Sequence, residues 1–420
     1  MKLLVFAHKP PPHHGQSYMI QLLLEQLGGD QRHPSSPSPG SPKKSPPPVQ
    51  CYHVDCRFSE GIQDIGRLQL RKLFQLARYC SEAIGCRLRY GVRNFLYVPS
   101  PPANRTALYR DWVVMTVCRL FFARRVYYWQ AAGLGSWLRS EARPWERWLS
   151  RCLLQHPDLS IVLAPANRGD GDELGSGRVA VVPNVIPDPC PRFDLEMLPR
   201  RRARAQALRH RLLGTPTPAP APPLVCNVLY LSLCTREKGL FDALDAVARL
   251  NSLPRLHTAG IRVRLTVCGG FWIEAEKAEF DGRIAQMRFP GGEPMVDYRG
   301  FVSGAGKEEV FRESDCFCFP TYYAAESFGL ALVEAMGSGL PVVTTRWRMI
   351  PDLLPAGYPG LVDLRSPGQI ADAILGCLER EYDDGLRRHF LAHYTAERFA
   401  ALMVEALSTL EPQAGAPPSR

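Results

Sequence analysis

Residues 320–343 read PTYYAAESFGLALVEAMGSGLPVV, and this stretch decides the fold. The apolar run 316–319 before it indicates a buried strand, and Leu330–Met336 indicates a helix that ends at a glycine-rich turn. Val342–Thr344 is a second buried strand. A strand, a helix and a strand joined by short turns predict one unit of a parallel sheet, whose ligands bind beyond the carboxyl ends of the strands.

The turn before this helix carries polar groups that suit an anionic ligand. Unpaired amides at a helix start form an anion site, and a glycine lets a ligand approach the backbone. Glu326 lies just before the helix, and Glu334 projects from its second turn. Two carboxylates beside an anion pocket suit a polyhydroxylated phosphate ester. From these residues alone, an acidic helix N-terminus without a ligand is an equally good interpretation.

The same alternation of strands and helices continues through the chain. Further strands are expected at 2–7, 126–129, 161–164, 179–182, 228–231 and 263–267. Amphipathic helices are expected after several of them, which predicts an α/β fold of parallel sheets covered on both faces.

Changes in composition divide the chain into domains. The Pro/Ser-rich stretch at about 30–51 is expected to be a surface insertion, and TPTPAPAPP a stiff linker. We expect a first domain at 1–198, a basic and Pro/Ala-rich linker at 199–222, a second domain at 223–390, and at 391–420 a helix followed by a disordered tail. That this helix returns to the first domain is implied only by the resemblance described below.

Charge is distributed unevenly over the 420 residues. Residues 1–222 hold 31 basic and 16 acidic side chains, a net charge of +15, whereas residues 223–420 carry a net charge of −5. A basic half is typical of a protein that meets an anionic partner. Gly66–Arg93 mixes arginines with leucines and aromatic residues, which suits either contact with an anionic bilayer or an ordinary helix with a basic face. No nucleic-acid-binding module is recognised, so nucleic acid is not an expected partner.

Several other patterns are weak. The 13 cysteines include no C-x-x-C pair, which indicates reduced thiols rather than a zinc or disulfide framework. Gly304–Lys307 lacks the glycine spacing of a phosphate-binding P-loop, and His389 and His393 lack the glutamate of a metalloprotease helix. The first residues form too short an apolar run for a signal peptide, so we expect a cytoplasmic protein.

The stretch 320–343 closely resembles the signature of glycosyltransferase family 4, the group 1 retaining nucleotide-sugar transferases of GT-B fold. Glu326 and Glu334 match its two glutamates, which are separated by seven residues. Further signature residues in place are Pro320, Phe328, Gly329, Ala335, Gly339 and Pro341. Landmarks of the family also occur in the expected order at Pro183-Asn184, Tyr230–Gly239, Cys268–Gly270 and Tyr298–Val302.

The resemblance implies two Rossmann-like, doubly wound parallel-sheet domains that face each other across a cleft. Among the implied catalytic residues, Glu326 holds hydroxyls of the transferred sugar and Lys238 neutralises the diphosphate. Gln130 or Tyr128 stands where many members have a histidine, and a glutamine, unlike a histidine, cannot gain or lose a proton at neutral pH. Leu233 replaces an arginine that usually binds the diphosphate, so Arg236 is a candidate substitute.

Further donor-binding residues follow from the same resemblance. Glu334 is implied to bind the ribose, and the amides of Phe328, Gly329 and Leu330 to face the sugar and diphosphate. The remaining implied donor-binding positions are Gly269, Gly270, Val302 and Gly15. For Gly15 a simple turn glycine is nearly as good an explanation.

The implied activity is transfer of a sugar from a nucleoside diphosphate sugar to an acceptor hydroxyl with retention of configuration. The acceptor would be a carbohydrate or lipid-linked sugar in polysaccharide or glycolipid biosynthesis, met in the cytoplasm or at the inner face of the membrane. No cofactor or metal is expected besides the nucleotide sugar. Two alternatives stay open: a nucleotide-sugar epimerase of the same fold, and a catalytically weak nucleotide-sugar-binding protein.

Overall fold

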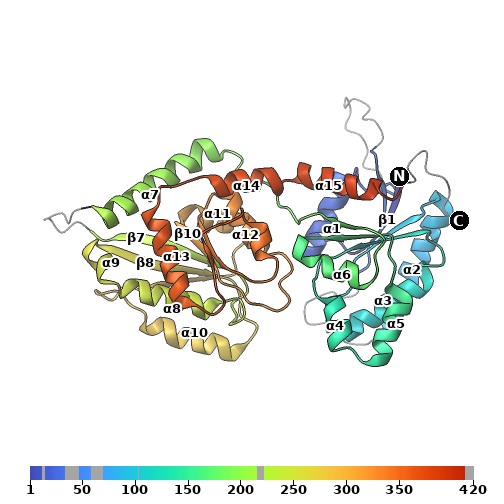
Figure 1. Cartoon of the computed structure of the whole chain (residues 1–420), viewed down its shortest axis with the longest axis horizontal. Coiled ribbons are helices and arrows are strands. Elements are labelled where there is room, and N and C mark those ends of the chain that lie inside the picture. The colour runs from blue at the N-terminus through green and yellow to red at the C-terminus, as the bar shows by residue number, and fades with distance from the viewer. Residues whose placement is uncertain (12–14, 34–46, 58–69, 103, 215–221, 412–420) are drawn as a thin grey trace. The chain divides into compact units, whose positions relative to one another are not determined.

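The computed structural model describes residues 1–420 except 12–14, 34–46, 58–69, 103, 215–221 and 412–420. The chain forms two compact units, Met1–Val185 with Ala396–Arg420, and Ile186–Thr395. Each unit contains one parallel six-stranded sheet among its described residues, with helices packed around it (Figure 1). The α/β class predicted from the sequence is therefore confirmed.

The first unit has the strand order β2-β1-β3-β4-β5-β6. Its strands are β1 (Lys2–Phe6), β2 (Gln50–Val54), β3 (Asn94–Tyr97), β4 (Arg124–Tyr128), β5 (Leu159–Val162) and β6 (Val179–Val181). Its α-helices are α1 (Gly15–Gln26), α2 (Leu70–Tyr90), α3 (Arg105–Cys118), α4 (Leu134–Ser140), α5 (Pro144–Leu154), α6 (Arg168–Glu173) and α15 (Ala396–Ser408), with a short 3-10 helix η2 (Pro165–Asn167).

The second unit has the strand order β12-β11-β10-β7-β8-β9. Its strands are β7 (Leu224–Leu231), β8 (Ile261–Cys268), β9 (Val296–Gly300), β10 (Cys316–Phe319), β11 (Val342–Thr345) and β12 (Leu361–Val362). Its helices are α7 (Leu198–Leu213), α8 (Leu240–Asn251), α9 (Pro254–Thr258), α10 (Glu274–Gln286), α11 (Gly304–Glu313), α12 (Leu330–Gly337), α13 (Pro367–Glu379), α14 (Gly385–His393) and the short η3 (Phe193–Met197) and η4 (Ile350–Leu353).

Burial explains why the central strands are almost continuously apolar. A parallel sheet with helices on both faces leaves no strand face for water. All four residues of β10, a Cys-Phe-Cys-Phe run, are buried, as are those of β11. In the first unit, Phe6, Phe95 and Tyr97 from β1 and β3 pack ring to ring in the core.

In both sheets the first strand lies in the interior, and later strands are added first on one side of it and then on the other. In the second sheet β8 lies on one side of β7 and β10 on the other. In the first sheet β2 and β3 flank β1 in the same way. Because crossover connections are right-handed, this reversal places helices on opposite faces and opens a crevice at the carboxyl ends of the two diverging strands.

The boundary between the units falls at Val185–Ile186 rather than within 199–222, where a linker was expected. Residues 198–213 form α7, which belongs to the second unit and buries Arg201, Leu208 and Leu212. Arg204 of this helix bonds Asp315 through both carboxylate oxygens, at 2.8 and 3.0 Å. The charged sequence therefore reflects a docked helix, and the Pro/Ala-rich residues 215–221 lie outside the described part.

The C-terminal segment also differs from its expected bounds. Helix α14 extends to His393 in the second unit, and α15 begins at Ala396 in the first. Arg178 donates to the Thr409 carbonyl at 2.6 Å, which ties the end of α15 to the first sheet. The predicted disordered tail lies outside the described residues.

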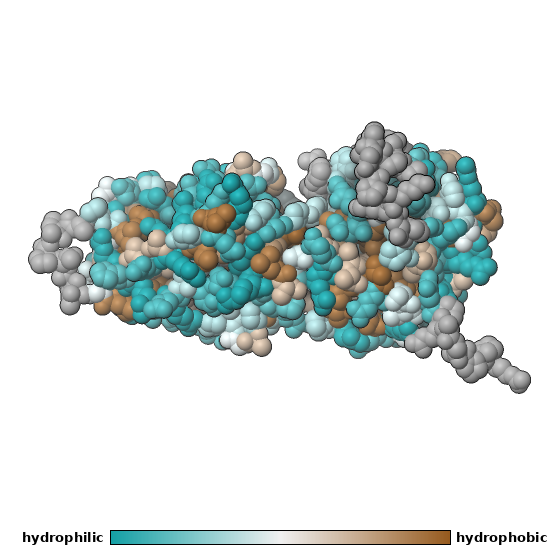
Figure 2. Space-filling model, turned by 90° about the horizontal axis from the view of Figure 1, so that it is seen from above, coloured by the Kyte–Doolittle hydropathy of each residue, from teal (hydrophilic) through white to brown (hydrophobic). Residues whose placement is uncertain are grey.

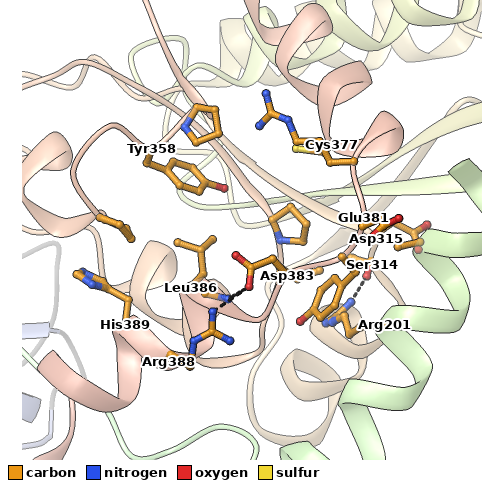
Figure 3. A pocket seen from close by; sticks show the side chains of 18 of the residues that line it. Arg201, Ser314, Asp315, Tyr358, Cys377, Glu381, Asp383, Leu386, Arg388 and His389 are labelled. Atoms are coloured by element: carbon orange, nitrogen blue, oxygen red, sulfur yellow. Dashed lines mark hydrogen bonds and ion pairs between the residues drawn. The ribbon is translucent and has the colours of Figure 1, made fainter.

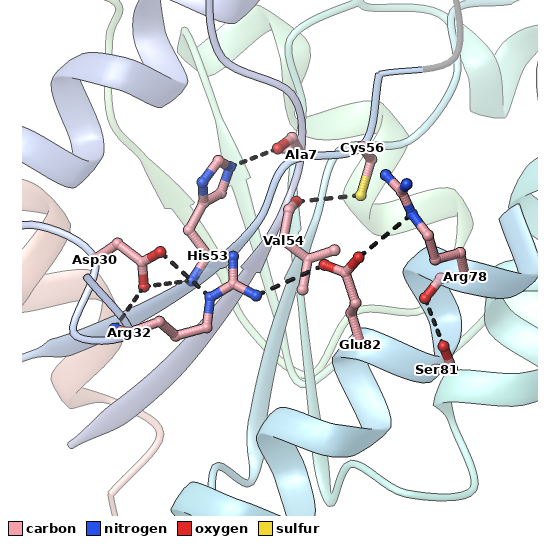
Figure 4. A network of polar contacts seen from close by, with 9 residues as sticks. All are labelled: Ala7, Asp30, Arg32, His53, Val54, Cys56, Arg78, Ser81 and Glu82. Carbon is pink, nitrogen blue, oxygen red and sulfur yellow. Dashed lines mark hydrogen bonds and ion pairs between the residues drawn. The ribbon is translucent and has the colours of Figure 1, made fainter. Parts of the chain in front are cut away.

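Two strands of the first unit were not predicted. β2 lies at the end of the expected insertion, most of which lies outside the described residues, and β3 directly follows the basic segment Gly66–Arg93. Asp30 accepts from the His53 amide of β2 at 3.1 Å and also pairs with Arg32, which reaches Glu82 of α2 (Figure 4). The end of the insertion is thus an integral sheet edge joined to α2.

Candidate functional site

The strongest candidate site lies where the second sheet reverses direction. β7 and β10 are neighbours at this point, and the loop after each strand runs into a helix. Lys238 belongs to the loop between β7 and α8, and Glu326 to the loop between β10 and α12. Both side chains therefore come from the two loops that flank the crevice of this sheet.

Lys238 and Glu326 form an ion pair with 2.7 Å between Nζ and Oε2. The two side chains are only 13% and 8% exposed, so water screens the pair weakly. The Thr321 hydroxyl donates to the same carboxylate oxygen at 3.1 Å. The ring of Tyr323 lies 4.7 Å from the ammonium, and burial, with the charges of Glu237 and Glu326, raises the pKa of this phenol. The cation is thus held beside a carboxylate and a protonated tyrosine.

Two glycines let the loops adopt this arrangement. Gly239 has φ +79°, and a Cβ there would lie 2.2 Å from the Pro320 carbonyl oxygen. Only glycine therefore lets the loop after β7 lie against the loop after β10. Gly329 has φ +78° and precedes the first turn of α12, while Phe328 is buried against Tyr394.

The start of α12 is positioned to hold an anion. The first amides of a helix have no acceptor within the helix and carry its positive dipole end. The N-cap of α12 is Gly329 and its first residue is Leu330, so these two amides are among them, whereas Phe328 precedes the cap. A phosphate group in this position would meet backbone donors and the Lys238 ammonium.

Glu334 is held by a different lysine. Its Oε1 lies 2.7 Å from the Nζ of Lys307 on α11, and the side chain of Glu334 is 17% exposed. Lys307 belongs to the segment rejected above as a P-loop. A lysine from one helix thus orients the carboxylate implied to bind the ribose, and sequence patterns gave no sign of this pairing.

The glycine loop after β8 approaches the loop after β7. Gly269 has φ +147°, and a Cβ there would lie 1.8 Å from the Ser232 carbonyl oxygen. The Cys234 amide donates to the Gly270 carbonyl at 2.9 Å. Val302 lies two residues beyond the end of β9, so the observed strand stops before it.

Arg236 does not join Lys238 and Glu326. Its guanidinium pairs with Glu279 of α10 at 2.5 Å and lies 4.4 Å from the ring of Phe241. Its positive charge is therefore satisfied by α10, and its role as a replacement for the arginine missing at Leu233 stays a prediction.

In the first unit, Gln130 follows β4 and is buried. Gln130 and Asn184 exchange two hydrogen bonds between their side-chain amides, each 3.2 Å long. The Tyr128 hydroxyl donates to Asn184 at 3.3 Å, and burial raises the pKa of this phenol. The amide of Gln130 is thus oriented by neutral groups. Gly15 is the first residue of α1 and is exposed.

The sequence analysis did not identify three residues that hold the site side chains in place: Thr321, Lys307 and Asn184. Thr321 and Asn184 lie inside motifs that the sequence analysis quoted, so their positions were available as a signal. Among the described residues, no group of three or more His, Cys, Asp and Glu side chains is arranged to hold a metal ion.

Comparisons with known proteins show which family and which fold this chain is similar to. Residues 227–396 match the family described as glycosyl transferases group 1. A phosphatidyl-myo-inositol mannosyltransferase of Mycobacterium leprae (strain TN) is 31% identical over 183 residues, 43% of this chain and 44% of that protein. A D-inositol 3-phosphate glycosyltransferase of Corynebacterium urealyticum is 29% identical over 275 residues, 61% of this chain and 58% of that protein. The chain thus spans less than half the length of the first of these relatives and somewhat more of the second.

The likeness to solved structures extends over both units. Anabaena Alr3699/HepE, crystallised in complex with UDP and glucose, matches with a TM-score of 0.57 and 17% identity, over 97% of this chain and 99% of that one. At this identity the match concerns the fold, and it agrees with the two Rossmann-like sheets. The fold is therefore the GT-B fold predicted from the sequence, and residues 227–396 match the group 1 glycosyl transferase family.

Proposed function

We propose that this protein is a retaining glycosyltransferase that moves a sugar from a nucleoside diphosphate sugar to an acceptor hydroxyl. The observation that carries the proposal is the shielded pair Lys238–Glu326, 2.7 Å apart at the carboxyl ends of neighbouring strands. A carboxylate that accepts from sugar hydroxyls and a cation that meets a diphosphate are the two groups that such a donor needs.

The positive groups have a defined part in the reaction. As the bond between sugar and diphosphate breaks, negative charge grows on the departing phosphate oxygen. Lys238 and the amides at the start of α12 stabilise that charge, and fixed donors need no reorganisation at that moment. Glu326 holds the sugar hydroxyls, and Glu334 the ribose, so the reacting carbon stays in position.

The acceptor proton needs a separate destination. Gln130 carries an amide, which cannot take up a proton near neutral pH. The proton therefore passes to an oxygen of the leaving diphosphate, on the same face of the sugar as the departing group. Attack from that face gives retention of configuration.

We further propose an acceptor that is lipid-linked and met at an anionic membrane surface. This rests on the first unit, where Phe74 and Leu88 of α2 are 78% and 75% exposed beside its arginines. The Arg87 guanidinium donates to the Phe121 carbonyl at 3.0 Å, which brings the exposed Leu120 and Phe121 to the end of α2. Exposed apolar side chains among arginines suit an anionic bilayer surface.

The rest of the surface fits peripheral rather than spanning contact. No helix among the described residues is both long and apolar enough to cross a bilayer. On the face seen in Figure 2, hydrophobic residues form small separate groups in a largely hydrophilic surface. The M. leprae relative is a phosphatidyl-myo-inositol mannosyltransferase, which adds support for a glycolipid acceptor, and a polysaccharide acceptor is the alternative.

Liposome flotation tests the membrane proposal. Wild type should float with vesicles containing phosphatidylserine and not with neutral vesicles. The variant Leu88→Glu/Leu120→Glu should lose flotation, whereas Phe301→Glu should keep it, because Phe301 is 83% exposed in the second unit. Equal flotation of all three proteins would contradict the proposed surface.

A donor screen followed by a transfer assay tests the function. We expect one of UDP, GDP and ADP, with its sugars, to raise the melting temperature. Release of that nucleotide should then depend on an added acceptor. An epimerase would convert the donor sugar without acceptor, and a binding protein would be stabilised without turnover. Either result would replace the proposed transfer.

A further inference from the structure

A large cavity lies at the opposite edge of the second sheet from the candidate donor site. It has a volume of about 700 Å³ and is lined by the residues that precede β10, β11 and β12, together with α7, α13 and α14 (Figure 3). Ser314 and Tyr358 mark the amino ends of β10 and β12 in its wall. Lys238 and Glu326 follow the carboxyl ends of the strands, so this cavity is a separate feature.

The carboxylates of the cavity wall already have partners. Asp315 pairs with Arg204. Asp383 pairs with Arg388 (Figure 3). Glu313 pairs with Arg299 at 3.1 Å and Glu381 with Arg209 at 3.4 Å. Because each of these four carboxylates is already paired with an arginine, none of them is left to balance the charge of any other arginine in the cavity wall.

Three arginines of the wall supply that further charge. Arg200 and Arg380 are exposed, and among the described residues they have no ion pair. Arg201 is 6% exposed and donates to backbone carbonyls alone, including Phe311 at 2.7 Å and Ser338 at 3.2 Å. Burial lowers the pKa of Arg201 to about 10, which still leaves it charged at neutral pH. The cavity thus contains cations without a matching carboxylate.

A neighbouring cavity of about 520 Å³ continues this positive character. It shares Arg200 and Arg204 with the first cavity and adds Arg264 and Arg299, of which Arg299 pairs with Asp297 and Glu313 in the same wall. The Nε of Arg264 is buried and has no hydrogen-bond partner. A buried donor without an acceptor is costly, so an incoming anion would satisfy a group that the protein leaves open.

The remaining wall of the larger cavity is apolar and aromatic. Tyr358, Leu386, Pro341 and Pro359 contribute to it, with His389 at its rim. A cavity of this size suits a drug- or nucleotide-sized molecule, and arginines match the geometry of phosphate oxygens. We propose that the cavity binds a small organic phosphate, with its phosphate at Arg200 and Arg380, beside the buried positive charge of Arg201, and its apolar part against Tyr358 and Leu386.

Isothermal titration of the full chain with 4-nitrophenyl phosphate tests the proposal. Wild type should bind this probe more tightly than it binds neutral 4-nitrophenol. The variant Arg200→Gln/Arg380→Gln should bind at least about tenfold more weakly, because two charge-assisted hydrogen bonds are lost. Arg202→Gln is the matched control, since this exposed arginine lies on the same helix but outside the cavity wall, and it should bind as wild type does.

A fourth protein separates this site from the donor site. Lys238→Met should bind the probe unchanged, so failure of the proposed transferase function would leave this result intact. The single variants Arg200→Gln and Arg380→Gln, each expected to weaken binding several-fold, replace the double variant if it does not fold. The proposal is overturned by absence of binding to wild type, by equal binding of the arginine variants, or by loss of binding in Lys238→Met.

Discussion

At the scale of single residues, the sequence identified the groups but not their partners. Lys238 and Glu326 were predicted through a family signature, and the structure brings them within 2.7 Å. The pairing of Glu334 with Lys307 was not predictable, because it joins two helices whose contact depends on tertiary packing. A sequence motif identifies residues and the local turn that carries them. A partner on another helix depends on how the helices pack on the sheet, which the motif does not show.

The shielded pair leads to a prediction for stability. Glu326→Gln or Lys238→Met alone leaves one charge without its partner, and each should cost roughly 3 kcal/mol of unfolding free energy. The double variant Lys238→Met/Glu326→Gln should recover about 1–3 kcal/mol relative to the sum of the single variants. Urea unfolding of the four proteins measures this coupling, and strictly additive losses would contradict a direct pair.

The same single variants should lose transfer activity. Each should lower kcat by about 10²–10³, as removal of one fixed charge stabiliser does in other enzymes. Initial rates at saturating donor, with folding checked by circular dichroism, give the measurement. Full activity in either variant would remove the pair from the proposed mechanism.

Lys307 provides a test of positioning. Lys307→Met should weaken nucleotide binding by roughly 2- to 10-fold, the value of one hydrogen bond, with little change in kcat. Lys277→Met is the control, because Lys277 pairs with Asp281 within one exposed helix. If both variants bind the nucleotide equally, Lys307 does not orient Glu334 for binding.

At the scale of elements, buried and regular segments were predicted and short or charged ones were not. β10 was predicted with its observed bounds and β11 ended one residue early, since both are apolar runs closed by turn residues. β3 has only four residues, which is too few to show a hydrophobic period. It also begins with a polar residue, Asn94, which is buried because its side chain donates to the Lys2 carbonyl at 2.7 Å. Most of α7 was predicted to be a linker because arginine usually indicates exposure to solvent. The Arg201 side chain is nevertheless buried, since backbone carbonyls accept its hydrogen bonds.

The contact between the loops after β7 and β10 predicts an effect at Gly239. Gly239→Ala introduces a Cβ 2.2 Å from a carbonyl oxygen at φ +79°, so it should cost about 1–3 kcal/mol and weaken donor binding. Gly282→Ala, in α10 with open space around it, should instead stabilise by about 0.5–1 kcal/mol. Thermal unfolding and nucleotide titration of both variants decide the matter. Unchanged stability of Gly239→Ala would show that the two loops can separate freely.

The segment after Val185 is tied to α14 by a carboxylate. The Arg387 guanidinium donates to both carboxylate oxygens of Asp188, at 2.5 and 2.7 Å. Burial alone would raise the pKa of this carboxyl, but its hydrogen bonds and the charge of Arg387 together outweigh burial and lower the pKa. Because the folded pKa is depressed, the stabilisation is complete above the unfolded value of about 3.9 and is lost as pH falls through the folded value. Asp188→Asn should cost about 1–3 kcal/mol at pH 7 and less at pH 3, which lies below the unfolded pKa. Urea unfolding at both values, with Asp363→Asn as an exposed control, measures this, and a pH-independent difference would contradict it.

At the scale of the whole molecule, the chain has two separate hydrophobic cores, so the proposed nucleotide binding should stabilise only the unit that contains the site. The second unit holds Lys238, Glu326, Glu334 and the start of α12, and each unit has its own apolar cluster. A ligand that binds only folded protein raises stability by about 2.7 kcal/mol at 100 times its Kd, and it acts on the unit that contains the site. Calorimetry of the full chain should therefore show the nucleotide shifting the transition of the second unit upward. The transition of the first unit should stay in place, and an equal shift of all unfolding heat would mean that donor binding draws on both cores.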